Sequence, residues 1–314
     1  MQCNNNYMAY KIINREDQQV FLGSGQVYGA QAIQYSWQVP EAPLEFIGQT
    51  NSLIVPQGPQ IGDFSIDSAV VTSDPFIKCI QSGGFNGFIM EERGAPHKAY
   101  SFYSGYLTNY SLQCSVDSVP QAKAQFRVVG DMGKIQTGAL PENAMEEMRH
   151  ITGTDKVGPS GGFKIGAPTN IEITLDDFDT NLVSNFNLSI SIPRKDYYKL
   201  GRRDPFRVEI DYPVIATAEF TIEVNGAELG YSGSTFRGYP CKQKLKTFDV
   251  KIKDYQEDSL LTQFSFSGAT LVGEVYSASV EENVKIQAKY KTYIQNLITT
   301  NNDLNTPQLV TITN

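Results

Sequence analysis

The chain has 314 residues, about twice the length of a typical single domain, so two domains are expected. Apolar residues make up 40% of the chain and charged residues 19%, which fits a packed globular protein and excludes a disordered tail, a collagen and a coiled coil. The formal net charge is −8, from 34 acidic and 26 basic residues, which argues against a protein that binds nucleic acid through an overall positive charge.

The N-terminal residues and the scattered cysteines predict a soluble protein without a metal or a cofactor. Met1 to Asn14 lack the basic segment and apolar run of a secretory signal, and no stretch approaches the ~18 apolar residues that span a bilayer. Isolated thiols are favoured over a metal site, because no two ligand residues have chelating spacing. The residues concerned are Cys3, Cys79, Cys114 and Cys241, with His97 and His150 as the only histidines.

Alternation of apolar and polar residues with a period of two dominates the chain and predicts strands, beginning with Ile33–Pro40. A short helix is expected over Pro75–Gln81, with Asp74 as its N-cap and Gly83 as its stop, and a second over Pro141–His150. Many short strands and few helices predict a mainly β fold, with two tandem antiparallel β-sandwich or barrel domains. Further strands are expected at Ile171–Leu175, Ala218–Val224, Phe248–Ile252 and Val284–Tyr290.

Five segments of the first half recur in the same order in the second half, which indicates a tandem duplication. The prediction is a first β domain over residues 10–130, a linker over 131–165, a second β domain over 166–292 and a C-terminal arm over 293–314. The matches pair Ile33–Pro40 with Phe186–Pro193, Phe64–Asp67 with Val208–Asp211, Phe85–Ile89 with Phe248–Ile252, Ser101–Gly105 with Phe264–Gly268, and Ser115–Phe126 with Ser279–Tyr290.

The polar faces of the strands divide into two chemical classes. One class is basic and is interpreted as solvent-facing; it contains Lys123, Gln125 and Arg127, and Lys285, Gln287, Lys289 and Lys291. The other class is neutral or acidic and predicts the lining of a channel or a wet contact, with an ordinary solvated face as the alternative. Its members are Gln34, Ser36, Gln38, Asn187, Ser189, Ser191, Glu172, Glu219 and Glu223.

Charge is also unevenly distributed between the two copies. No Lys or Arg occurs from Glu16 to Ile77, whereas the matching part of the second copy is rich in both. Opposite fields on equivalent arms favour contact between copy one of one subunit and copy two of another, although the basic residues could simply solubilise an arm. The interface candidates are Glu41, Glu45 and Asp63, with Arg194, Lys195, Lys199, Arg202, Arg203 and Arg207.

Motifs for catalysis are missing from the chain. The glycines from Gly23 to Gly29 have the wrong spacing for a dinucleotide site, and no phosphate loop is present. Gly230–Gly233 is one residue short of a nucleophile elbow, and a Ser/His/Asp triad would have to use His97 or His150 from segments that read as loop or linker. The prediction is therefore a protein that is not an enzyme.

Several segments of the second copy resemble the tail-tube proteins of long-tailed bacteriophages. An alternating strand and a Pro/Tyr/Gly arm over Asn185–Gly201 precede a return strand over Val208–Val214. Phe264–Leu271 and Val275–Ser279 are similar to the closing hairpin of that family. The longer first arm, Gly48–Ile66, and an insert over 226–246 depart from the pattern.

The resemblance implies a structural virion protein that is assembled in the host cytoplasm and resides in the tail. Each copy would be a tube-type β-sandwich, and three duplicated subunits would close a pseudo-hexameric ring. Rings would stack into a tube that carries DNA, so the implied partners are further copies, other tail proteins and passing DNA, with no membrane. A two-domain module that binds glycans or a host surface is the alternative, and a β-rich hydrolase is a third possibility.

Overall fold

The computed structural model shows a mainly β chain with one short helix among its described residues. The linker helix candidate 141–150, Cys3, Cys241, both histidines, Glu45, Arg203 and residues 226–245 lie outside those residues. The described residues are 18–22, 25–44, 53–56, 61–71, 74–81, 85–91, 98–129, 132–136, 164–175, 183–202, 204–223, 246–257, 259–279, 282–294, 296–301 and 307–312.

In the described part of the chain, the elements are strands with a single helix among them. Those of the first half are β1 (Gln18–Leu22), β2 (Gly25–Gln26), β3 (Ala30–Gln38), β4 (Glu41–Leu44), β5 (Leu53–Pro56), β6 (Ile61–Ala69), α1 (Ile77–Gln81), β7 (Phe85–Glu91), β8 (Lys98–Ser115), β9 (Ser118–Val128) and β10 (Met132–Gln136). Those of the second half are β11 (Gly166–Leu175), β12 (Val183–Ser191), β13 (Arg194–Tyr197), β14 (Arg207–Ile210), β15 (Val214–Glu223), β16 (Lys246–Asp254), β17 (Leu260–Ser279), β18 (Glu282–Ile294), β19 (Asn296–Asn301) and β20 (Pro307–Ile312).

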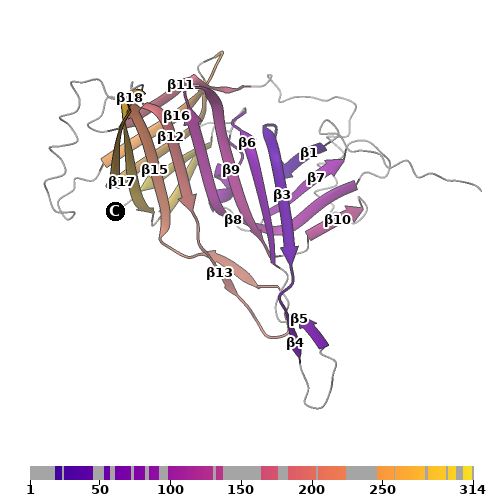
Figure 1. Ribbon diagram of the computed structural model, residues 1–314. Helices are drawn as coiled ribbons and strands as arrows, with labels where there is room; N and C mark the ends of the chain where they lie inside the picture. Colours follow the sequence, from indigo (N-terminus) through magenta and orange to yellow (C-terminus); the bar gives the residue numbers. More distant parts are fainter. Residues whose placement is uncertain are drawn as a thin grey trace, which may run out of the picture.

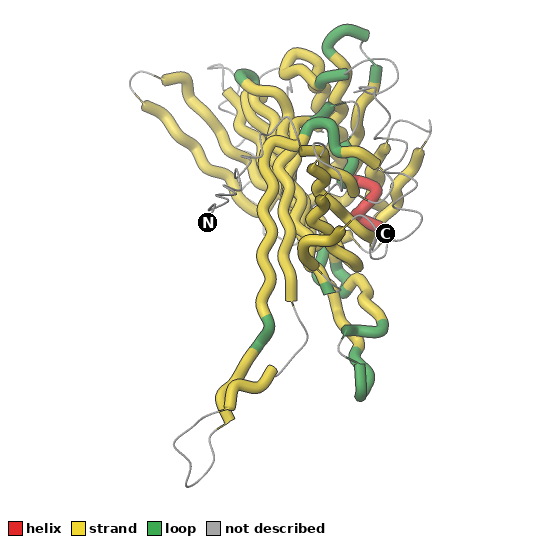
Figure 2. Tube along the Cα trace, turned by 90° about the vertical axis from the view of Figure 1, so that its right-hand side faces the viewer, coloured by secondary structure: helices red, strands yellow, loops and turns green. Residues whose placement is uncertain are grey.

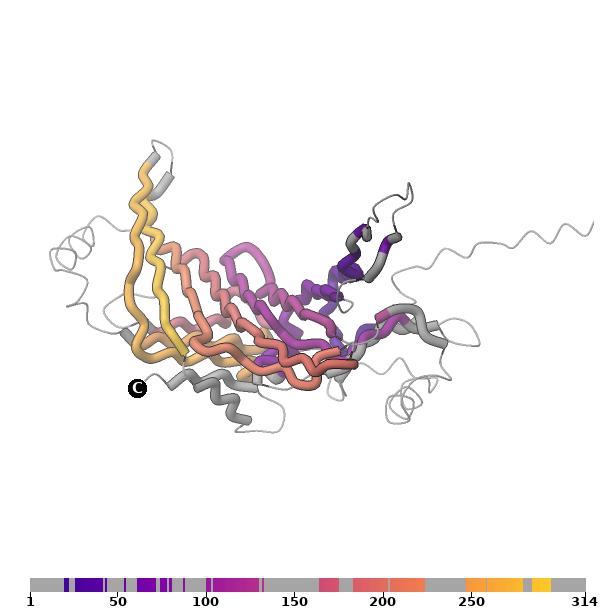
Figure 3. The backbone as a smooth tube through the Cα atoms, turned by 90° about the horizontal axis from the view of Figure 1, so that it is seen from below, coloured from indigo at the N-terminus to yellow at the C-terminus, as the bar shows by residue number. Residues whose placement is uncertain are grey.

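The largest element of the fold is an antiparallel sheet, here called the long sheet, with the strand order β3-β6-β9-β8-β12-β15-β18-β17 (Figure 1). Its strands form because apolar and polar residues alternate, so that one face can be buried. In β15 every second residue from Val214 to Ile222 is buried. Seen from below, the colour runs along this sheet from indigo to yellow, so the two ends of the sheet come from opposite parts of the chain (Figure 3).

A second layer covers the apolar face of the long sheet. The first halves of β8 and β17 lie in this second layer. There β8 pairs with β7 and β10, and β17 pairs with β16 and β20. Ser104 and Gly268, both at positive φ, mark the change of partner. The aromatic rings of Phe64 and Phe102 meet across the layers at 4.6 Å, and the core is one continuous cluster.

The pairing pattern repeats between β1 to β9 (repeat 1) and β11 to β18 (repeat 2). Phe126 pairs with Leu107, and Tyr290, 164 positions on, pairs with Leu271 in the same way. Even the irregularities recur, and β-bulges are specific features of a fold rather than accidents. Register shifts fall between Ala30/Ala32 and Val183/Asn185, Phe85/Gly87 and Lys246/Phe248, Leu107/Asn109 and Leu271/Gly273, and Gln113/Ser115 and Ser277/Ser279.

The ladder registers agree with two of the five sequence matches. The pair of Ile33 with Ile66 is equivalent to the pair of Phe186 with Phe220. Ile33 and Phe186 are 153 residues apart, which is the offset of the sequence match. The match of Ser115–Phe126 with Ser279–Tyr290 also agrees, at an offset of 164.

The other three matches are wrong in part or entirely. Phe64 corresponds to Ala218 in β15, whereas Val208 lies in the hairpin strand β14. For β7 and β16, the sequence match lies two residues away from the structural correspondence, in which Phe85 is equivalent to Lys246. A shift of two residues keeps the same side chains on the buried face, so the alternation in the sequence does not reveal it. For β8 and β17 it is displaced by one, because the positive-φ glycine Gly268 corresponds to Ser104 and not to Gly105.

The short helix is confirmed as α1, although it begins at Ile77 and not at Pro75, and its predicted stop, Gly83, lies outside the described residues. Asp74 accepts a hydrogen bond from the Phe76 amide at 2.8 Å, as an N-cap does. The predicted domain boundaries stay a prediction, because a single sheet runs through both repeats where β8 pairs with β12.

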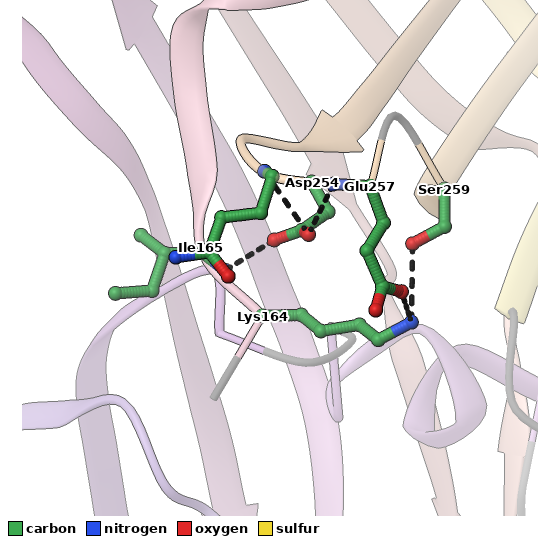
Figure 4. Close-up of polar contacts among 6 residues, drawn as sticks. Lys164, Ile165, Asp254, Glu257 and Ser259 are labelled. Carbon is green, nitrogen blue, oxygen red and sulfur yellow. Dashed lines mark hydrogen bonds and ion pairs between the residues drawn. The ribbon is translucent and has the colours of Figure 1, made fainter. Parts of the chain in front are cut away.

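Repeat 2 begins at a polar anchor on the turn after β16 (Figure 4). The Asp254 carboxylate accepts hydrogen bonds from the amides of Ile165 at 2.9 Å and Glu257 at 3.0 Å. The ammonium of Lys164 pairs with the Glu257 carboxylate at 2.6 Å and donates to the Ser259 hydroxyl at 3.2 Å. These contacts fix the entry of β11 beside β16.

Candidate functional site

The predicted channel-lining residues lie on the polar face of the long sheet, with one exception. Across neighbouring strands Gln113 lies opposite Asn187, Asn187 opposite Glu219, and Glu219 opposite Lys289. In the next row of the same face, two residues along β12, Ser189 lies opposite Ser111 and Thr217. Gln34, Ser36, Gln38, Ser191 and Glu223 have the same parity in their strands and share this face.

The exception is Glu172, which does not lie on this face, so its role as a lining residue stays a prediction. It lies on β11 in the second layer, opposite Lys251, and its carboxylate pairs with Lys253 at 2.5 Å. The alternation within β11 does not reveal to which layer the strand belongs.

The predicted separation of basic faces from neutral ones is also wrong. Lys123 lies opposite Ser111, and Ser111 opposite Ser189, so basic and neutral residues share the polar face. The charges there are paired across strands: Lys123 with Asp67 at 2.9 Å and Lys289 with Glu219 at 2.6 Å. The face therefore carries mixed, mutually neutralising charge, not the neutral or acidic surface expected from single strands.

A hollow on this face brings together candidates from separate segments. Asn109 donates to Gln125 there at 3.1 Å. Phe64 and Phe126 also contribute to the lining but are buried, so they offer no flat aromatic surface. The polar lining residues are Gln34, Ser36, Asp63, Ser65, Thr108, Asn109 and Gln125.

Among the described residues, no further strand pairs with β3 or with the second half of β17 at the two ends of the long sheet. β3 has β6 as its ladder partner, and the second half of β17 has β18. The equivalent strands in the middle, β12 and β8, pair with each other from Asn185–Ser115 to Ser191–Asn109. The chain therefore contains one complete junction between repeats, formed by β8 and β12. The strands equivalent to its two sides, β17 and β3, lie at opposite ends of the long sheet.

The side chains at the open ends differ from their internal equivalents mainly in exposure. Trp37 on β3 is 56% exposed, whereas Ile190, at the same position on β12, is 0% exposed. Tyr276 on β17 is 52% exposed, and its equivalent Leu112 is 1% exposed. Apolar side chains that are covered at the internal junction are thus uncovered at both ends, which is typical of an unfilled interface.

Two hairpins extend the long sheet beyond the same border (Figure 1). Arm 1 (β4 and β5) follows β3, and arm 2 (β13 and β14) follows β12 at the equivalent position. From the side, arm 1 projects well away from the two layers (Figure 2). The acidic and basic arms predicted from charge are therefore structural equivalents.

Arm 2 is not simply an exposed basic loop. Arg194 Nε donates to the Leu107 carbonyl of repeat 1 at 3.0 Å, and Asp196 pairs with Arg127 at 2.6 Å. Asp196 is not among the predicted interface residues, because in the sequence it lies between basic residues. The other basic candidates are exposed: Lys195, Lys199 and Arg202, with Arg207, which pairs with Glu209.

Of the acidic interface candidates, Glu41 is exposed at the start of arm 1. Asp63 lies on β6 opposite Arg127, on the polar face and not on the arm. Its inclusion among the arm charges is therefore wrong, because the return strand begins earlier than the charge pattern suggested.

The described residues contain no cluster of three or more His, Cys, Asp or Glu placed to hold a metal ion. Within the same part of the chain, no helix has the length and apolar character required to span a membrane. No protein-family model matches the sequence, and no curated protein matches it significantly.

Proposed function

We propose that this chain is a structural subunit of a bacteriophage tail tube, in which three copies close a pseudo-hexameric ring and rings stack around a lumen for DNA. The observation that supports this proposal is the internal β8–β12 junction, whose two halves recur uncovered on β17 and β3. A second copy can therefore add to either end of the long sheet by the contact that already joins the repeats.

Such a contact is head-to-tail, since the β3 end of one copy meets the β17 end of the next. Heterologous contacts give a closed ring when the rotation per step divides the circle, and a helical filament otherwise. Two equivalent repeats per chain make each ring of three chains a ring of six similar positions. The number six comes from the resemblance to tail-tube proteins.

The polar face is the side of the long sheet that suits the lumen. The second layer covers the apolar face, which leaves the polar face for solvent or DNA. Paired charges such as Lys123–Asp67 and Lys289–Glu219 give this face little net positive charge. Weak attraction to phosphate lets DNA slide through without sticking.

The alternative is a tail or baseplate module that binds glycans, and the polar hollow is the feature that favours it. Sugar-binding surfaces usually combine polar groups with an exposed aromatic ring. The aromatic residues of the hollow are buried, and Trp37 lies on the opposite face of β3. The tube subunit therefore accounts for more of the exposed apolar surface than the glycan module does.

The experiment is negative-stain imaging of the purified full chain over a range of concentrations, with the mass measured by light scattering. We expect rings of three copies with a six-lobed outline, some of them stacked into short tubes. A monomer at every concentration would overturn the proposal. Binding on a glycan array by such a monomer would support the alternative.

A further inference from the structure

The base of arm 2 shows how an arm docks on a neighbouring repeat. The Ile192 amide donates to Thr108 at 2.7 Å, continuing the β8–β12 ladder towards the arm. The Arg194 guanidinium then lies 5.7 Å from the Tyr106 ring centroid. Asp196, whose side chain is 8% exposed, neutralises Arg127. The arm thus contributes both packing and a nearly buried ion pair.

We propose that arm 1 docks in the same place on repeat 2 of the next copy, and that Glu41 there forms an ion pair with Lys291 of that copy. This inference rests on the proposed ring. Glu41 occupies the position of Arg194, because both begin the first strand of their hairpin, 153 residues apart. Lys291 occupies the position of Arg127 by the offset of 164 that relates β9 to β18.

The surroundings of Lys291 differ from those of Arg127 in a way that favours this contact. Arg127 lies opposite Asp63 on β6 and is paired with Asp196. Lys291 lies opposite two uncharged residues, Thr217 and Thr270. Its ammonium lies 4.9 Å from the Tyr293 ring centroid. Of the described strands, neither β15 nor β17 therefore places a carboxylate directly opposite Lys291.

The residues of arm 1 complement that difference. In arm 1 the residue equivalent to Asp196 is Pro43, which has no carboxylate. The carboxylate of arm 1 lies two residues earlier, at Glu41. The bulky Tyr106 is replaced by the smaller Thr270, between the expected site of Glu41 and Lys291. A glutamate can then reach across the threonine to the ammonium.

The relocated ion pair would also set the order of repeats in the ring. On repeat 1 the docking place is already filled by arm 2 of the same chain, through Arg194 and Asp196. Arm 1 therefore has its vacant, complementary surface on repeat 2 of another copy. Opposite charges at matching places favour this pairing and disfavour like repeats meeting.

A charge exchange tests the inference. Glu41→Lys and Lys291→Glu should each weaken ring formation about tenfold, the loss expected for one partly buried ion pair replaced by repulsion. The double variant, with both changes, should recover ring formation to within about threefold of the unchanged protein. Asp117→Lys, in the turn between β8 and β9 away from both open ends, is the matched control and should form rings normally.

The outcomes separate this inference from the proposed function. If the unchanged protein forms rings and both single variants form them equally well, the Glu41–Lys291 contact is wrong and the ring stands. Failure of the double variant to recover, with all variants showing unchanged circular dichroism, also overturns the contact. If the unchanged protein forms no rings, the proposed function itself fails.

Discussion

Trp37→Lys is expected to abolish ring formation and leave a folded monomer. Trp37 lies on the open strand β3, where its equivalent in the internal junction, Ile190, is completely buried. Losing a buried aromatic residue at the centre of an interface typically costs about 2 kcal/mol or more, and a charge placed there adds desolvation. That is roughly 30-fold weaker association at each junction. Light scattering and circular dichroism measure the two parts of this expectation.

Trp37→Ile is the matched control, since it installs the residue of the internal junction. It keeps an apolar side chain at this position, so rings should persist, although less tightly associated. If Trp37→Lys forms rings as well as the unchanged protein does, β3 is not an assembly edge. If Trp37→Ile is monomeric as well, the open edge is not equivalent to β12.

The second large effect is on stability and concerns Asp74, which is fully buried beneath the junction. Burial raises the pKa of this carboxyl to about 6, although hydrogen bonds from the Tyr110 hydroxyl and the Phe76 amide lower it. Because the folded state holds the proton more tightly than the unfolded state, this stabilisation is complete at low pH. It is lost as the pH rises through about 6, by about 2 kcal/mol between pH 4 and pH 7.

Asp74→Asn removes the titrating group and keeps an acceptor for the Phe76 amide. In the monomeric Trp37→Lys background, urea unfolding at several pH values should show the two stability curves diverging between pH 4 and pH 7. Other carboxylates contribute equally to both proteins and cancel in the difference. Parallel curves would show that Asp74 ionises normally. Tyr110→Phe should steepen the dependence, because it removes a hydrogen bond to the charged form.

Local features of the fold were predictable because neighbouring residues determine them. The N-cap Asp74 identified α1, and strict alternation identified β12 and its equivalent β3. The repeat was visible where bulky residues and a terminal proline fixed the register, as at Ile33 and Phe186. It was misread at Phe64, where β15 offers the small residue Ala218 in its place.

What the sequence could not reveal is which strands lie side by side. Ser189 and Lys123 were assigned to different surfaces, yet both belong to one row across β12, β8 and β9. The junction between β8 and β12 joins residues about 75 positions apart, so no local pattern marks it. The arms were recognised by charge, but the ion pair of Asp196 with Arg127 depends on that junction.

The most direct measurement of the assembly is disulfide trapping between Gln34→Cys and Ser277→Cys in one chain. The internal pair Asn187–Gln113 places these positions directly opposite each other when β3 of one copy meets β17 of the next. Directly opposite Cβ atoms are about 5 Å apart, close to disulfide reach. Gln34→Cys with Val275→Cys, displaced by two residues, is the register control.

Mild oxidation should give covalent dimers and trimers on a non-reducing gel, with the series ending at three chains because a closed ring leaves no free engineered thiol. A series that continues past three would mean an open filament. Trapping that is absent, or more efficient in the displaced pair, would mean that copies of this chain do not repeat the contact that joins its own halves.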